Sequence, residues 1–200
     1  MVIAGVMIEE NDEEKLRKIG VKDSKMLTPK QRERLFPLIK KIAKDYVALK
    51  VSAKEIDESR KIKNLNIIEA EKMAQIIKIM GADIAYVDTP QASTEKFKAI
   101  LLTLAKNRTE IIAENYCDER YPVCSAASII AKVERDREVE KIKKIVNYNF
   151  GVGYSHDARS IDFVKKCLRE KKHLEFIRHS WVTVDILKSK KEQKSLKEYK

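Results

Sequence analysis

Two aspartates stand where the sequence predicts that β-strands end. Asp88 closes the apolar run Asp83–Asp88, and Asp118 follows the strand-like run Thr109–Glu114 after a short polar turn. Pro122 then opens a long helix, so the positive end of a helix dipole falls near Asp118. Ligands bind where strands end in sheets with crossover helices, and a helix start can hold a phosphate or a metal-bound anion. The alternative, which composition alone favours, is that these carboxylates only cap turns.

The segment Ala113–Arg137 carries the most distinctive motif. It contains Ala-Glu-x-x-x-Asp-x-x-Tyr-Pro-Val-x-Ser-Ala-Ala-Ser-Ile-Ile-Ala-Lys, whose small residues let another segment pack very close. This motif resembles the signature of the archaeal type of ribonuclease HII, a family that cuts the RNA strand of RNA–DNA hybrids. The resemblance implies that Asp118 is a metal ligand. The family usually has His-Lys-Ala before this aspartate, where this chain has Asn115, Tyr116 and Cys117.

Two further segments resemble the same family. Tyr-Val-Asp ends at Asp88, and the resemblance makes Asp88 a second metal ligand. Val-Lys-Asp-Ser-Lys precedes a Thr-Pro helix start, and in the family the lysine and serine of this loop face the nucleic-acid backbone. Lys22, Ser24 and Lys25 are therefore expected to contact phosphates. On the residues alone, a solvated basic loop is an equal alternative.

Candidate substrate contacts also occur in the last quarter of the chain. The run Asn149–Arg159 resembles the family's Gly-x-Gly-Tyr-Pro-x-Asp loop, so Tyr154 is expected to recognise the nucleotide junction beside the cut. Ser155 stands where the family has proline. The alternative is that Tyr154 anchors the loop to the core. Arg-His-Ser-Trp resembles the family's Arg-x-Ser-Trp, and its Arg178 is expected either to contact the substrate backbone or to pair with an acid.

The composition favours a polyanionic partner. The 200 residues include 42 Lys and Arg against 31 Asp and Glu, which gives a net charge of +11. This excess favours nucleic acid, although thermostable proteins also carry heavily charged surfaces. No apolar run is long enough to cross a bilayer, and the N-terminus does not read as a signal peptide, so we expect a cytoplasmic protein. Three cysteines and three scattered histidines indicate neither a disulfide framework nor a histidine metal site.

The hydrophobic pattern predicts alternating strands and helices. The resemblance makes this an α/β fold, a ribonuclease H-like mixed β-sheet flanked by helices, with a helical C-terminal extension. We expect a catalytic domain over residues 1–150, a substrate-contacting loop with C-terminal helices over 151–187, and a Lys-rich tail over 188–200. Strands are expected over residues 1–9, 46–52, 83–88 and 109–114, and the main helices over 12–19, 28–44, 64–80, 93–106, 122–146 and 160–171.

One motif of the family is absent from the sequence. The family's opening strand carries Asp-Glu-x-Gly-Arg-Gly, which supplies two of four active-site carboxylates and a clamp on the ribose 2′-OH. Asp57-Glu58 is no substitute, because Ser59 and Arg60 follow without glycines. We therefore expect an empty slot between the strands at residues 1–9 and 83–88. We also expect Met1 to be an internal methionine of a longer chain.

The function implied by the resemblance is endonucleolytic hydrolysis of the RNA strand of RNA–DNA hybrids, leaving 5′-phosphomonoesters. Two Mg²⁺ or Mn²⁺ ions held by Asp88 and Asp118 are expected to serve it. The expected substrates are hybrids and DNA duplexes that contain ribonucleotides, bound by a monomer. The alternatives are a non-catalytic remnant that binds hybrids or duplexes, and an unfolded fragment. Gln193, Leu196 and Tyr199 resemble a motif that docks replication proteins on the sliding clamp, without its second aromatic residue.

Overall fold

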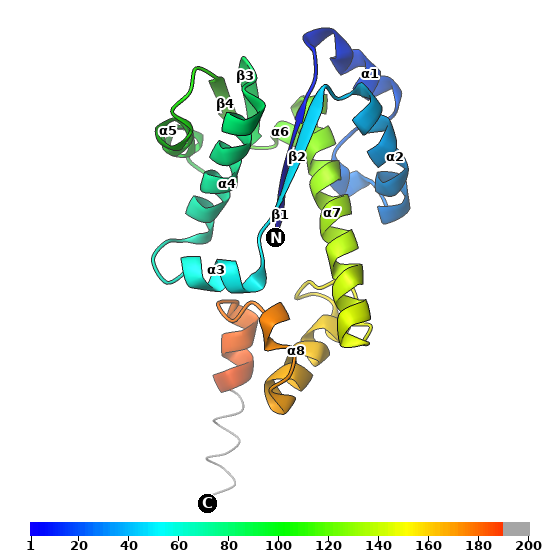
Figure 1. Ribbon diagram of the computed structural model, residues 1–200, viewed down its shortest axis with the longest axis vertical. Coiled ribbons are helices and arrows are strands. Elements are labelled where there is room, and N and C mark those ends of the chain that lie inside the picture. Colours follow the sequence, from blue (N-terminus) through cyan, green and yellow to red (C-terminus); the bar gives the residue numbers. More distant parts are fainter. Residues whose placement is uncertain (190–200) are drawn as a thin grey trace, which may run out of the picture. The chain divides into compact units, whose positions relative to one another are not determined.

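The computed structural model describes residues 1–189, which fall into two units (Figure 1). The first unit comprises Met1–Lys50 and Leu65–Arg135. The second comprises Val51–Asn64 and the described residues from Asp136 onward. Each unit has hydrophobic side chains buried in its own interior. Within the described residues, no helix combines the length and the apolar character needed to cross a membrane.

Four strands of the first unit form two separate two-stranded sheets. β1 (Val2–Met7) pairs antiparallel with β2 (Asp45–Lys50), and β3 (Ile84–Asp88) pairs parallel with β4 (Glu110–Glu114). The sequence predicted a mixed sheet with an empty slot between the strands at residues 1–9 and 83–88. The two sheets are separate at this place, because β1 and β3 are not hydrogen-bonded to each other. Parallel pairing brings the carboxyl ends of β3 and β4 to the same edge, which places Asp88 opposite Glu114.

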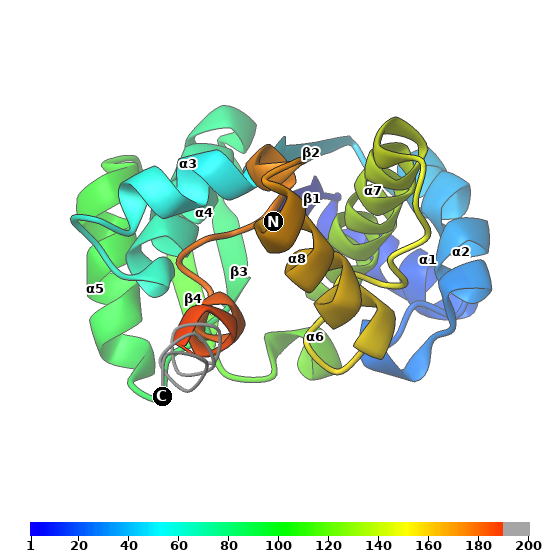
Figure 2. The same cartoon turned by 90° about the horizontal axis from the view of Figure 1, so that it is seen from below.

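Six helices belong wholly or partly to the first unit. They are α1 (Glu13–Lys18), α2 (Pro29–Ile42), α4 (Leu65–Met80), α5 (Thr94–Ala105), α6 (Cys117–Arg120) and α7 (Pro122–Val146). Figure 2 shows α4 and α5 beside the β3–β4 sheet, where Phe97 and Leu101 are fully buried with Ile111. The start of α7 packs on α2 in a second cluster that includes Ile39 and Ile129. Burial of apolar side chains on one face of each helix stabilises both clusters.

The start of α2 follows the sequence prediction. The Thr28 hydroxyl accepts a hydrogen bond from the Gln31 N–H, and the Gln31 side chain accepts one from the Thr28 N–H. This capping box and Pro29 at the first helical position satisfy the end of the helix. The helix ends at Ile42, two residues before the predicted Lys44. The Lys44 N–H instead donates to the Met7 carbonyl at 2.8 Å, which begins the pairing of β2 with β1.

Gly5 allows β1 to approach α4 closely. A Cβ atom at this position would lie 2.5 Å from Cγ2 of Ile76 and 2.9 Å from Sδ of Met80. Real side chains do not tolerate such distances, so any larger residue would push helix and strand apart. Both contact residues lie in the last turns of α4, and β3 begins shortly after the helix ends.

The second unit is built mainly from helices. It contains α3 (Ala53–Ser59), the C-terminal part of α7, α8 (Ala158–Glu170), a 3-10 turn at Leu174–Phe176, and a helical stretch over residues 182–189 (Figure 2). Phe163, Cys167 and Val184 lie together in its core. The helix that the sequence predicted from residue 160 begins earlier, at Ala158. The cap is Asp157, whose carboxylate accepts from the Arg159 N–H, and Ser160 lies buried in the first turn.

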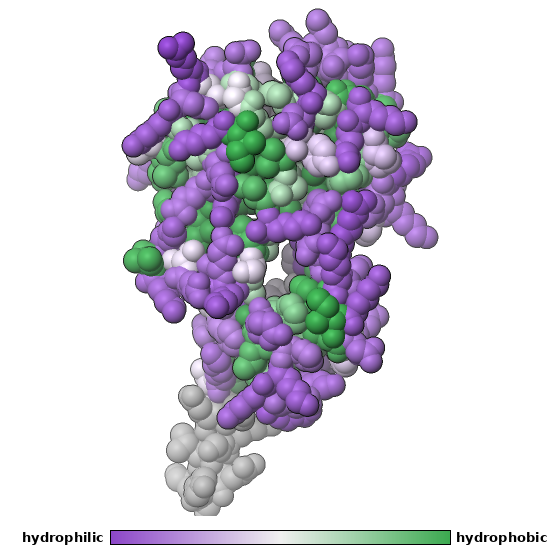
Figure 3. Space-filling model, in the orientation of Figure 1, coloured by the Kyte–Doolittle hydropathy of each residue, from purple (hydrophilic) through white to green (hydrophobic). Residues whose placement is uncertain are grey.

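The surface view in Figure 3 is mainly hydrophilic, with apolar side chains between charged ones. This agrees with a sequence in which 36% of residues are charged.

Candidate metal and nucleic-acid site

The fold brings Asp88 and Asp118 together. Asp88 is the last residue of β3, and its Oδ1 accepts a hydrogen bond from the Cys117 N–H at 3.1 Å. Cys117 begins the short helix α6, in which Asp118 is the second residue. Both aspartates line one cavity of about 270 Å³. The backbone of the β4–α6 segment therefore positions the second predicted ligand beside the first.

Asp118 is a buried carboxylate with unused binding capacity. Only 3% of its surface is exposed, and Oδ1 has no hydrogen-bond partner among the described residues. Its Oδ2 lies 3.9 Å from Nζ of Lys25. The Ser125 hydroxyl donates to the Asp118 carbonyl, which holds the backbone but leaves the carboxylate without a partner on one side. Burying such an oxygen costs free energy unless a cation or donor reaches it.

The charges of the two aspartates act on each other. Burial raises the pKa of Asp88, and the negative charge of Asp118 raises it further, while the Cys117 N–H and Lys25 oppose the rise. A divalent cation between the carboxylates would relieve this repulsion, and carboxylate oxygens are ligands that suit Mg²⁺ and Mn²⁺. The donor set thus fits a hard divalent ion. Within residues 1–189, however, no cluster of three or more His, Cys, Asp or Glu is placed to hold a metal.

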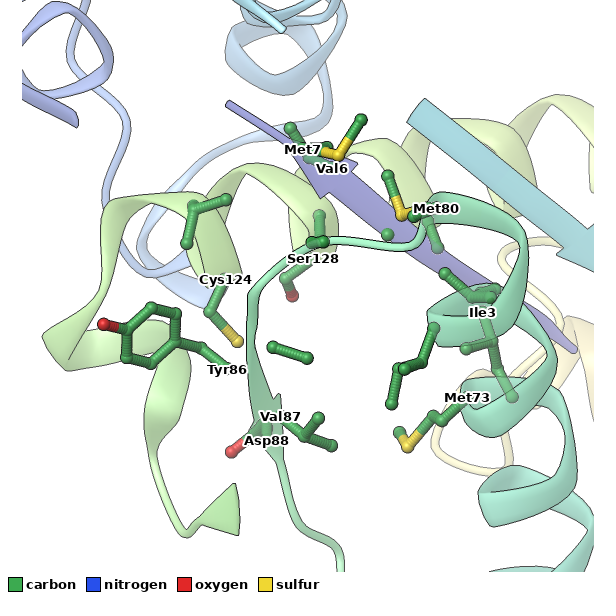
Figure 4. Close-up of a pocket in the computed structure, with 18 of the residues that line it drawn as sticks. Ile3, Val6, Met7, Met73, Met80, Tyr86, Val87, Asp88, Cys124 and Ser128 are labelled. Carbon is green, nitrogen blue, oxygen red and sulfur yellow. The ribbon is translucent and has the colours of Figure 1, made fainter. Parts of the chain in front are cut away.

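A largely apolar cavity separates β1 from β3 (Figure 4). Ile3 and Met7 line it from β1, and Val87 lines it from β3. Figure 4 shows Cys124 and Ser128 reaching into it from α7. The unpaired strands and the cavity match the slot expected between residues 1–9 and 83–88.

The three predicted phosphate contacts in the loop before α2 differ in exposure: the two lysines are exposed and the serine is buried. Lys25 is exposed and approaches Asp118, as described above, and Lys22 is exposed and lines a second pocket. Ser24 is fully buried, and its hydroxyl is hydrogen-bonded to that of Ser128 at 2.8 Å. Ser24 therefore ties the loop to α7 instead of presenting a hydroxyl to solvent. Arg32 supports the same loop by donating to the carbonyls of Ser24 and Leu27.

In the second unit, Tyr154 lies on a tightly held loop. Its side chain is 46% exposed, and its ring stacks on His156 with centroids 5.5 Å apart. Asp157 fixes the loop by accepting from the Val152 N–H at 2.8 Å and pairing with Arg159. Gly151 has a φ of +77°, and a Cβ there would overlap the Asp157 carboxylate. The loop can therefore present an aromatic ring in a defined position.

Asp57 has a structural role that the sequence did not reveal. Its two carboxylate oxygens accept hydrogen bonds from the N–H groups of His179 and Ser180, at 2.7 and 2.8 Å. It thereby fixes the turn that follows Arg178. The Arg178 side chain is half-buried. The partners lie more than a hundred positions apart in the chain. No local pattern could have indicated this contact.

Comparison with known proteins identifies the family. The family model for ribonuclease HII matches residues 1–184. The ribonuclease HII of Pyrococcus furiosus is 40% identical over 210 residues, which cover 100% of this chain and 91% of that protein. The ribonuclease HII of Archaeoglobus fulgidus is 41% identical over 190 residues, which cover 95% of this chain and 90% of that protein. The chain belongs to the ribonuclease HII family.

Solved structures of the family share the fold. The PCNA:RNase HII complex from Archaeoglobus fulgidus contains a chain with a TM-score of 0.84 at 40% identity, covering 93% of this chain and 88% of that chain. Ribonuclease H2 from Pyrococcus horikoshii gives a TM-score of 0.83 at 35% identity, covering 95% of this chain and 98% of that chain. These matches confirm the predicted fold class. The roles of the individual site residues stay predictions.

A divalent ion should stabilise the protein through Asp118. Adding Mn²⁺ is expected to raise the thermal unfolding midpoint, because the ion binds the folded state and removes the carboxylate repulsion. At about a hundred times the dissociation constant, the gain is about 2.7 kcal/mol. Asp118→Asn should abolish most of this rise. Glu119→Gln, at an exposed neighbouring position, is the control and should keep it. An equal rise in Asp118→Asn would contradict the assignment.

The Tyr154 loop should contribute pH-dependent stability. Arg159, and next the Val152 N–H, lower the pKa of Asp157 from 3.8 to about 2. A carboxyl group with a depressed pKa in the folded state stabilises above its unfolded pKa of about 4, and this stabilisation is lost as the pH falls toward 2. The difference in unfolding free energy between wild type and Asp157→Asn should therefore be constant at neutral pH and shrink between pH 4 and 2.

Urea unfolding followed by Trp181 fluorescence measures this difference, since Trp181 is the only tryptophan in the sequence. Asp162→Asn removes an exposed ion pair with Lys165 on the same helix and serves as the control. A difference that does not change between pH 4 and 2 would contradict the role of Asp157.

Proposed function

We propose that this chain hydrolyses the RNA strand of RNA–DNA hybrids as an endonuclease, leaving 5′-phosphomonoesters. One observation carries the proposal: Asp88 and Asp118 meet at the end of the β3–β4 sheet, with a buried carboxylate oxygen that has no protein partner in the described residues. This is the environment that a catalytic cation requires. The family relationship over residues 1–184 supports the choice of substrate.

Asp88 and Asp118 would hold Mg²⁺ or Mn²⁺, and two ions are proposed. Such ions supply an activated water and charge stabilisation at the scissile phosphate. The protein's own groups orient the two carboxylates and surround them with apolar side chains. The Cys117 N–H fixes the Asp88 carboxylate, and the Ser125 hydroxyl fixes the backbone of Asp118. The apolar walls of the adjoining cavity lower the local dielectric, which strengthens each charge interaction.

Four exposed or half-buried side chains are proposed to bind the hybrid: Lys22, Lys25, Tyr154 and Arg178. Lysines contact phosphates without reading sequence. An aromatic ring such as Tyr154 can pack on a sugar or base, a contact worth about 1–3 kcal/mol in stacking systems. Ser24, which the sequence also predicted as a phosphate contact, supports this role through the position that it gives to Lys25. RNA would be distinguished from DNA by its 2′-OH groups.

A non-catalytic hybrid-binding protein is the second candidate. The observation that favours it is the small number of ligands, because no group of three or more His, Cys, Asp or Glu within the described residues is placed to hold a metal. The sequence also contains no Asp-Glu-x-Gly-Arg-Gly motif. Two carboxylates hold two cations weakly, so binding without cleavage would be the expected behaviour of such a protein.

Cleavage of a labelled RNA–DNA hybrid with Mg²⁺ or Mn²⁺ distinguishes the two candidates. We expect cleavage by the wild-type chain, and Asp118→Asn should reduce the rate by at least about 100-fold, because an essential electrostatic group is lost. Glu119→Gln should retain the rate.

Each other outcome has a definite meaning. Hybrid binding without cleavage would overturn the enzymatic proposal and favour the binding protein. If cleavage then appeared in a variant extended by a strand with Asp-Glu-x-Gly-Arg-Gly, the four-carboxylate requirement of the family would apply to this chain. Loss of cooperative thermal unfolding would instead indicate an unfolded fragment.

We also propose that the chain binds a sliding clamp through Gln193, Leu196 and Tyr199, which lie outside the described residues. Support comes from the similarity to the protein in the PCNA:RNase HII complex. Deleting residues 192–200 should weaken clamp binding by at least about tenfold, because Leu196 and Tyr199 would share one helical face in the contact. Surface plasmon resonance on an immobilised clamp measures this. Equal affinities of the full and shortened chains would exclude the tail as the docking element.

A further inference from the structure

A half-buried lysine near the two aspartates has no role in the function proposed above. Lys132 lies on α7, one turn after Ser128, and its Nζ donates to the Ser128 hydroxyl at 3.2 Å. That hydroxyl is in turn bonded to Ser24 at 2.8 Å. The ammonium group of Lys132 is therefore connected by two hydroxyls to the loop that carries Lys25.

The electrostatic surroundings of Lys132 are unusual for a lysine. Burial lowers its pKa, and the positive charges of Arg32 and Lys25 lower it further, while Asp118 and Asp23 act in the opposite direction. Three cations thus lie within electrostatic range of one another. Such a grouping is unfavourable unless anions offset it. A divalent ion on Asp118 would add still more positive charge.

The two lysines reach the site in different ways. Lys25 approaches Asp118, with Nζ 3.9 Å from Oδ2, but its side chain is 60% exposed. Lys132 is half-buried and held by Ser128, so it loses little conformational freedom when an anion binds. One exposed ammonium group lies 3.9 Å from Asp118, and one half-buried ammonium group, held by Ser128, lies within electrostatic range of the same carboxylate. They suit an anion that arrives from solvent at the edge of the metal site.

We propose that Lys132, together with Lys25, binds a phosphodiester group of the nucleic-acid strand next to the Asp88–Asp118 pair. Ser24 and Ser128 position Lys132 for this contact. The inference deepens the proposed function and rests on it, because it assigns the anion as substrate backbone. A phosphodiester fits better than a carboxylate-rich protein, since two compact point charges neutralise a single small anion and the whole chain carries a net charge of +11.

A structural role for Lys132 makes a different prediction. If Lys132 only offset the charge of Asp118, its removal would destabilise the fold, and Asp118→Asn in the same chain would restore stability. The number of ions released on nucleic-acid binding would then not change. Counterion release therefore separates the two roles, because it counts the phosphates that the protein neutralises.

The test is fluorescence anisotropy of a labelled RNA–DNA hybrid over a series of NaCl concentrations, without divalent ions. Lys132→Met should weaken binding about three- to tenfold at low salt, and the slope of log K against log salt should fall in magnitude by about 1. Lys132→Arg keeps the charge and should retain the wild-type slope. Lys141→Met, which removes an exposed lysine 2.8 Å from Glu138 on the same helix, should change affinity by less than about twofold.

A second variant removes the positioning instead of the charge. Ser128→Ala should weaken binding and leave the salt slope unchanged, because the ammonium remains but is no longer held. Thermal unfolding of every variant shows that the compared proteins are folded. A wild-type salt slope in Lys132→Met would overturn the inference.

The outcomes also separate this inference from the proposed function. Hybrid cleavage by the wild type, combined with an unchanged slope in Lys132→Met, would remove the role of Lys132 alone. Hybrid binding with the expected slope change but no cleavage would remove the enzymatic proposal and leave the phosphate contact standing. Absence of hybrid binding by the wild type would overturn both.

Discussion

The repulsion between two neighbouring carboxylates is the constraint on which the first unit depends. Asp88 and Asp118 approach because β3 pairs with β4 and because the Cys117 N–H holds the Asp88 carboxylate. The arrangement raises the pKa of Asp88 and leaves a buried oxygen of Asp118 without a protein partner in residues 1–189. A structure selected only for stability would not retain it. A cation bound as proposed would offset this unfavourable energy.

The open edges of β1 and β3 form a second constraint. Unpaired strand edges expose N–H and C=O groups that a neighbouring strand would normally satisfy. Here those edges line an apolar cavity, and Gly5 lets β1 approach Ile76 and Met80 of α4, which line the same cavity. The cavity borders the aspartates, so whatever fills it changes their dielectric surroundings. The cavity therefore affects both the stability of the fold and the electrostatic environment of the two aspartates.

Local rules predicted the elements of this fold well and their long-range contacts poorly. The Thr28 capping box and the strand ending in Asp88 could be read from residue types and spacing. The burial of Ser24 could not, because its partner Ser128 is 104 positions away. Asp57 and its turn are a similar case. The start of α8 was predicted too late because Asp157 and Ser160 are both good capping residues. Asp157 is the cap in the structure, where its carboxylate also accepts a hydrogen bond from the Val152 N–H of the preceding loop.

The charge balance of the site links metal binding to substrate binding. Two divalent ions, as proposed above, would carry four positive charges, whereas Asp88 and Asp118 supply two negative ones, and Lys25 adds a further positive charge nearby. The site as a whole is then strongly cationic, so ions alone are held weakly. A phosphodiester brings both negative charge and oxygen ligands. Each partner should therefore raise the affinity of the other by the same factor, as thermodynamic linkage requires.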